Sequence, residues 1–76
     1  MGKIVYCSTP MGSRQFRVQV IEDQGEFFAA VRFGAWDTGP LYVWRDEPLP
    51  TIRGAVEMGH VHRSELLLWE AEAVVA

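Results

Sequence analysis

Two stretches of alternating apolar and polar residues, 14–22 and 26–33, constrain this chain more than any other feature. Alternation of period two is typical of a strand with one buried face, and Gly25 between the stretches can adopt the positive φ of a tight turn. A two-residue Gln24-Gly25 turn keeps one face apolar, whereas a three-residue loop would mix the faces. The predicted pairs are Val20 with Ala29, Val18 with Val31 and Phe16 with Phe33, which a four-residue loop from Asp23 would also give.

The other face of this hairpin places Arg17 opposite Arg32. Like charges directly across a strand pair are unfavourable. We therefore expect an acidic neighbour or a ligand beside these two side chains.

Two more strands are predicted on either side of the hairpin. Residues 3–8 form one, which ends in the Pro- and Gly-containing turn 9–13. Residues 41–45 form a short one after the glycine-bounded loop 34–40. Its alternation places Leu41 and Val43 on one face and Tyr42 and Trp44 on the other.

A short helix is predicted after the proline-rich segment 46–50, which cannot be a central strand. Pro50 suits the first turn of a helix, and an apolar stripe at helical spacing includes Ile52 and Ala55. We expect Gly59 to end the helix. Gly54, inside it, is expected to permit close packing on the sheet.

Residues 64–75 fit either a helix or a strand. Their Leu, Glu and Ala content favours a helix, but Trp69, Ala71 and Ala73 alternate with Glu70 and Glu72, which favours a strand. We predict a strand. The fold class is therefore α+β: an antiparallel sheet of four to five strands with one short helix packed on it, in a single small domain spanning residues 1–76.

The composition supports a packed domain with apolar surface to spare. The chain is 49% hydrophobic and carries four Phe, three Trp and two Tyr in 76 residues. Some of this aromatic surface is expected to remain for a partner or a homodimer. The N-terminal apolar run is too short for a signal peptide, and no stretch approaches the roughly 20 apolar residues of a membrane helix. We expect a cytoplasmic protein without membrane contact.

No residue pattern indicates an enzyme, a cofactor or a metal site. Cys7 is the one cysteine, and its apolar neighbours indicate a buried structural thiol. His60 and His62 would share a face if extended, but they lack a ligand motif such as His-Glu-x-x-His. A polar segment after a helix is the preferred interpretation. We expect a protein that acts by binding.

Acidic loops and one tryptophan form the predicted partner-binding site. Trp36 lies between glycines in a surface turn, where it is either a binding hot spot or a lid over the core edge. Acidic residues gather at the hairpin tip and in the loops, a distribution that can compete for a basic groove. The predicted site residues are Glu22, Asp23, Glu26, Trp36, Asp37, Asp46 and Glu47.

A nucleic-acid-binding sheet face is the alternative hypothesis. Arginines and aromatics on one sheet face can grip single-stranded RNA, and that face would combine Arg17, Arg32, Phe28, Tyr42 and Trp44. The net charge of −3 argues against it, because such domains are usually basic. An antitoxin-like partner protein that uses the same sheet face is a further alternative.

The hairpin 14–33 with its acidic tip 22–26 and the loop 34–40 give the chain a build that resembles the anti-CRISPR proteins, small inhibitors carried by phages and mobile elements. The resemblance rests on overall build, so it assigns no functional residues. It implies a viral protein that acts in the cytoplasm of a bacterial host cell and occludes a nucleic-acid-binding surface of a CRISPR-Cas type defence complex. The partner would then be a protein or a protein–nucleic acid complex, with direct nucleic-acid binding less favoured.

Overall fold

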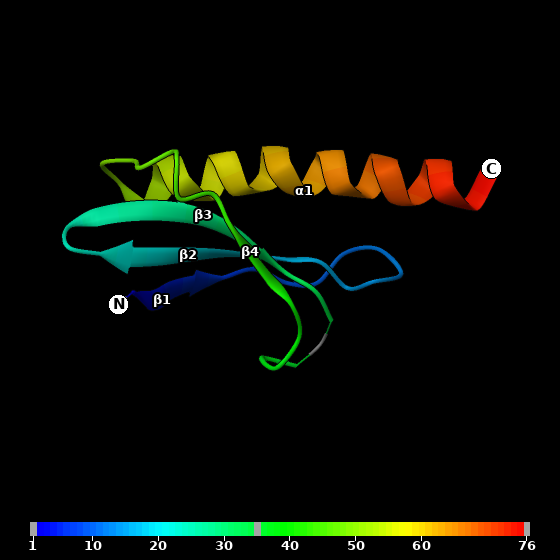
Figure 1. Cartoon of the computed structure of the whole chain (residues 1–76), viewed down its shortest axis with the longest axis horizontal. Coiled ribbons are helices and arrows are strands. Elements are labelled where there is room, and N and C mark those ends of the chain that lie inside the picture. The colour runs from blue at the N-terminus through cyan, green and yellow to red at the C-terminus, as the bar shows by residue number, and fades with distance from the viewer. Residues whose placement is uncertain (1, 35, 76) are drawn as a thin grey trace.

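Four antiparallel strands form one sheet, and a single long helix lies across one of its faces (Figure 1). The computed structural model of the chain describes residues 2–34 and 36–75, with side chains as far as residue 71. The predicted α+β class is confirmed, although the helix is long. In sheet order, the elements are β1 (Lys3–Cys7), β2 (Arg17–Asp23), β3 (Glu26–Arg32) and β4 (Leu41–Val43), followed along the chain by α1 (Ile52–Val75).

The β2–β3 hairpin has the register that the apolar pattern predicted. Val18 pairs with Val31 and Val20 with Ala29, and the pairing continues to Asp23 and Glu26. Only Gln24 and Gly25 remain in the turn, which excludes the four-residue loop. Their φ values of 53° and 81° are both positive. Two successive positive φ values are the signature of a type I′ turn, whose twist suits a hairpin.

Most of the core lies between α1 and the apolar face of the hairpin. Val18, Val20, Val31 and Ala55 are fully buried there. Gly59 lies in the middle of α1 and allows close approach to the sheet, because a Cβ atom at this position would lie 2.4 Å from Cγ1 of Val18. The prediction that Gly59 ends the helix was therefore wrong.

Gly54, predicted to permit close packing on the sheet, instead lies in the first turn of α1. A Cβ atom there would meet only the hydroxyl of Thr51, at 3.1 Å. That hydroxyl accepts a hydrogen bond from the Gly54 amide at 3.0 Å. Thr51 therefore caps the helix, which begins after Thr51 and not at Pro50.

The predicted C-terminal strand is also wrong, because residues 64–75 continue α1. Leu67 and Glu70 of this segment contact the connection between β1 and β2. A Cβ atom at Gly12 would lie 2.5 Å from Leu67, and Glu70 accepts hydrogen bonds from the amide and the hydroxyl of Ser13. Because Leu67 and Glu70 are three residues apart, they share a face in a helix but lie on opposite faces in a strand, so these two contacts favour a helix. In the described part of the chain, no helix combines the length and the apolar character needed to cross a membrane.

Candidate partner-binding surfaces

Five of the predicted acidic site residues gather at one end of the molecule. Glu22, Asp23 and Glu26 stand at the tip of the β2–β3 hairpin. The backbones of Phe27 and Leu49 exchange two hydrogen bonds of 2.9 Å, which hold the segment after β4 beside this tip. Asp46 and Glu47 belong to that segment.

Internal contacts engage two carboxylates of this acidic end. The guanidinium of Arg45 lies 3.1 Å from the carboxylate of Asp23. Oε1 of Glu47 lies 3.3 Å from Nε2 of His62, without the alignment of a hydrogen bond. Glu26 and Asp46 are exposed and belong to none of the ion pairs formed among the described residues. These two carboxylates are therefore the strongest acidic contacts that this end offers.

Trp36 and Asp37 lie on a different part of the molecule. Their loop, residues 34–40, follows the far end of β3, so the seven residues of that strand separate it from the hairpin tip by about 20 Å. Figure 1 shows the loop below the sheet, away from α1. The structure therefore divides the predicted site into an acidic end and a tryptophan loop.

Two arginines of the sheet hold this loop. Nη1 of Arg32, a residue only 9% exposed, donates to the carbonyls of Asp37 at 2.8 Å and Gly39 at 3.0 Å. Arg17 donates to the carbonyl of Gly34 and lies 3.2 Å from the carboxylate of Asp37. The acidic neighbour predicted for the Arg17–Arg32 pair is thus Asp37. Loop carbonyls and one carboxylate stabilise two like charges that face each other across the hairpin.

Trp36 projects into solvent from this loop. Its exposed fraction is 77%, so it does not cover the core edge as a lid. The lid interpretation of its surface turn is therefore excluded, and the hot-spot interpretation stays a prediction.

The predicted face of arginines and aromatics does not exist. Tyr42 pairs with Val31 and therefore points to the helix side of the sheet. Trp44 points the same way and stacks on His62 of α1, with ring centroids 3.9 Å apart. Arg17 and Arg32 stand on the opposite face with Phe28. These residues were predicted to share one face because the apolar pattern does not define the register between β3 and β4.

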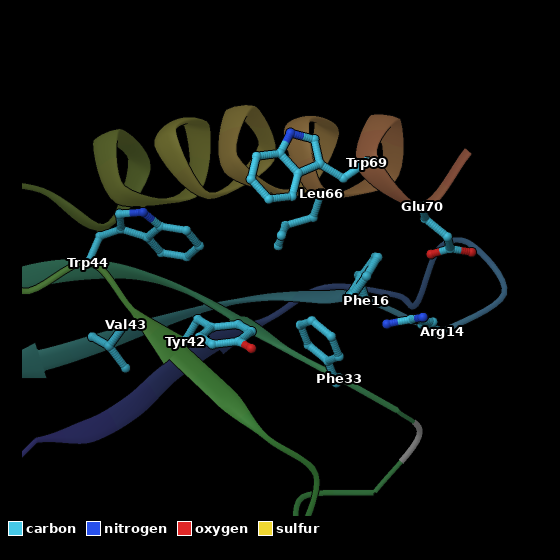
Figure 2. A pocket seen from close by; sticks show the side chains of 9 residues that line it. All are labelled: Arg14, Phe16, Phe33, Tyr42, Val43, Trp44, Leu66, Trp69 and Glu70. Atoms are coloured by element: carbon cyan, nitrogen blue, oxygen red, sulfur yellow. The ribbon is translucent and has the colours of Figure 1, made fainter. Parts of the chain in front are cut away.

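A groove between α1 and β4 brings these aromatics together, and the sequence did not predict it. Its volume is about 610 Å³ (Figure 2). The alternation in 41–45 indicated that Tyr42 and Trp44 share a face, but the helical wall is formed by residues that were predicted to be a strand. The lining residues are Arg14, Phe16, Phe33, Tyr42, Val43, Trp44, Leu66, Trp69 and Glu70.

The remaining reactive side chains do not converge. Cys7 is exposed, which corrects the expectation of a buried thiol, because it lies on an edge strand with no cover. His60 and His62 lie in α1, where residues two apart point in different directions. No group of three His, Cys, Asp or Glu side chains with metal-binding proximity occurs among the described residues.

Comparison with known proteins finds no family model, curated protein or solved structure that matches the chain. The fold and its surfaces are therefore the basis for a functional proposal.

Proposed function

We propose that this chain is a non-catalytic protein-binding inhibitor that acts by covering a surface of its partner. The observation that carries this proposal is the projection of Trp36 from a loop that two sheet arginines hold in place. Tryptophan is the residue type most enriched among binding hot spots, because it buries a large area in a partner's pocket.

The anchoring of the loop makes this projection useful for binding. A free loop loses conformational entropy when it is ordered against a partner, and that loss weakens the complex. Here Arg32 fixes the carbonyls of Asp37 and Gly39 before any partner arrives. The loop is therefore already ordered in the free protein. Less of the contact energy of Trp36 is then offset by conformational entropy lost on binding.

The acidic end supports a partner with a basic surface. Glu26 and Asp46 are exposed there, and the chain as a whole carries a net charge of −3. Such a surface is attracted to the grooves that other proteins use for nucleic acid. By the resemblance to anti-CRISPR proteins, the target we propose is a nucleic-acid-binding surface of a bacterial defence complex, encountered in the cytoplasm.

The first test is an affinity capture from bacterial lysate that contains CRISPR effector complexes. The tagged chain is compared with Trp36→Ala and with Val61→Ala, a matched control whose exposed side chain lies on the solvent side of α1. We expect one stoichiometric protein, which loses its nucleic-acid binding in the complex. Trp36→Ala should weaken capture at least about tenfold, and Val61→Ala should leave it unchanged.

A second variant separates the two parts of the predicted site. Charge reversal with Glu26→Lys and Asp46→Lys should reduce the association rate and its salt dependence if the acidic end faces a basic partner. Equal capture by all variants would show that the proposed surface is wrong. Recovery of nucleic acid without protein would instead favour the nucleic-acid-binding alternative.

A further inference from the structure

We infer that the groove between α1 and β4 binds an extended segment of another protein, which adds to the edge of β4 and carries a carboxylate at its C-terminal end. This site lies on the helix side of the sheet, whereas the 34–40 loop is held on the other side. The inference is therefore independent of the function proposed for Trp36.

The free edge of β4 supplies the backbone part of the site. β4 is the last strand of the sheet. The amide of Phe33 donates to the carbonyl of Pro40, and the amide of Trp44 donates to the carbonyl of Ala29. Because hydrogen-bonding direction alternates along an antiparallel strand, the backbone groups of Leu41 and Val43 point away from β3. An added strand can pair with these two amides and two carbonyls.

The groove supplies the side-chain part of the site. A strand added to β4 lies about 4.8 Å from it, and every second side chain then points to the helix side. There these side chains enter the space between Tyr42 and Trp44 below and Leu66 and Trp69 above (Figure 2). Tyr42 is 52% exposed and Trp69 73% exposed, so a bound segment would cover apolar surface that the chain leaves open.

One charge at the groove's end gives the segment a direction. Arg14 is exposed and belongs to none of the ion pairs among the described residues. Oε1 of the neighbouring Glu70 accepts two hydrogen bonds from Ser13, and its Oε2 has no hydrogen-bond partner among the described residues. Figure 2 shows Arg14 at the end of the groove opposite Trp44.

Every pair of neighbouring strands in this sheet is antiparallel, and we propose the same orientation for the added strand. An antiparallel partner of β4 runs from the Trp44 side to the Leu41 side of the strand. Its C-terminal end therefore lies toward Arg14. The guanidinium fits either a terminal carboxylate or the side chain of a C-terminal Asp or Glu, because a fork of donors matches both.

The test uses short random peptides displayed with free C-termini as the probe. The best binder is then synthesised as the free acid, as the C-terminal amide, and with N-methyl groups on alternate backbone amides. Affinities are measured by fluorescence polarisation for the unaltered chain, Arg14→Gln, Trp69→Ala and Trp36→Ala. Urea unfolding of each variant verifies that it is folded, which is expected because all three side chains are exposed.

We expect selected peptides with apolar residues at every second position. Trp69→Ala should weaken binding about tenfold or more. Arg14→Gln should weaken the carboxylate-bearing peptide by about tenfold and leave a peptide without carboxylates unchanged. N-methyl groups should abolish binding when they stand on the alternate peptide amides that point toward β4, and should be tolerated on the other amides. Trp36→Ala should have no effect, which separates this site from the proposed inhibitor surface.

Four results would overturn the inference: failure to select any peptide, binding that is indifferent to Trp69→Ala, binding that tolerates every N-methyl group, or displacement of the peptide by nucleic acid. Sedimentation of the chain alone gives a fifth. If the chain self-associates and Trp69→Ala abolishes this, the groove's occupant is a second copy and not a peptide segment.

Discussion

Among the described side chains of α1, Arg63 is the most completely buried charged one. It is 6% exposed, and Nη1 lies within hydrogen-bonding distance of the Ser8 hydroxyl and of the carbonyls of Thr9 and Phe16. These acceptors all belong to the connection between β1 and β2. One side chain from the helix therefore joins three hydrogen-bond acceptors along this connection, which has a short backbone bridge of its own between Met11 and Phe16.

Replacement of Arg63 by methionine should be one of the most damaging changes in the chain. The Ser8 hydroxyl and the carbonyls of Thr9 and Phe16 each keep one other donor but lose a charge-assisted hydrogen bond, so we expect the free energy of unfolding to fall by about 2–3 kcal/mol. Urea denaturation measures this loss. Arg53→Met is the matched control, because Arg53 is exposed and its ion pair with Glu57 is expected to contribute under about 0.5 kcal/mol. Equal losses in the two variants would contradict a special role for Arg63.

At the scale of elements, the two residues of the β2–β3 turn both have positive φ, but only the first of them is strained by it. Gln24 has a φ of 53°, which costs an L-residue conformational energy, whereas Gly25 at 81° pays no such cost. A Cβ atom at Gly25 would meet nothing within 4 Å. A substitution there therefore tests the backbone alone.

Gly25→Ala should lower the free energy of unfolding by about 1–2 kcal/mol. Gln24→Gly should raise it, or at least not lower it, because the new residue relieves the positive φ. Thermal denaturation of the two variants gives the comparison. A loss of stability in Gln24→Gly as large as that in Gly25→Ala would argue against the type I′ turn.

The two glycines of α1 differ in what surrounds them. Gly59 faces Val18 of β2, so a methyl group there must push the helix from the sheet. We expect Gly59→Ala to destabilise the protein by about 1–3 kcal/mol. The methyl group of Gly54→Ala would face only the rotatable hydroxyl of Thr51. Because alanine has a higher helix propensity than glycine, this change should stabilise α1 by up to about 1 kcal/mol. Opposite signs in chemical denaturation are the expected result, and two equal losses would contradict the packing at Gly59.

At the scale of the whole molecule, α1 determines the shape. Its 24 residues span about 36 Å, close to the 42 Å longest extent of the molecule. The sheet is shorter than the helix, so the second half of α1 packs on the β1–β2 connection and forms a wall of the groove beside β4. A shorter helix would leave neither the groove nor a cover for that connection.

The charge distribution of the whole molecule predicts weak binding to polyanions. Arg17, Arg32 and Arg63, three of the seven basic residues, are occupied by hydrogen bonds inside the fold. The remaining bases are spread among ten acidic residues. On a heparin column we expect elution at or below about 0.15 M salt. Retention at much higher salt would favour the nucleic-acid-binding alternative.

The sequence by itself determined the β2–β3 hairpin. The apolar pairs of Val18 with Val31 and Val20 with Ala29, together with a glycine at the turn, leave one register that buries a whole face. The facing arginines and their acidic neighbour followed from the same register. This information is local, because strand partners joined by a two-residue turn are near neighbours along the chain.

Only the tertiary structure decided the C-terminal half of α1, and with it the groove beside β4. The run around Leu66 and Trp69 is compatible with helix or strand until Gly12 and Ser13 meet it from more than fifty residues away. Likewise, the exposure of Trp36 depends on the hydrogen bonds that Arg17 and Arg32 donate to its loop. Both outcomes depend on contacts between distant segments, and local propensities of about 1 kcal/mol per residue are too small to outweigh such contacts.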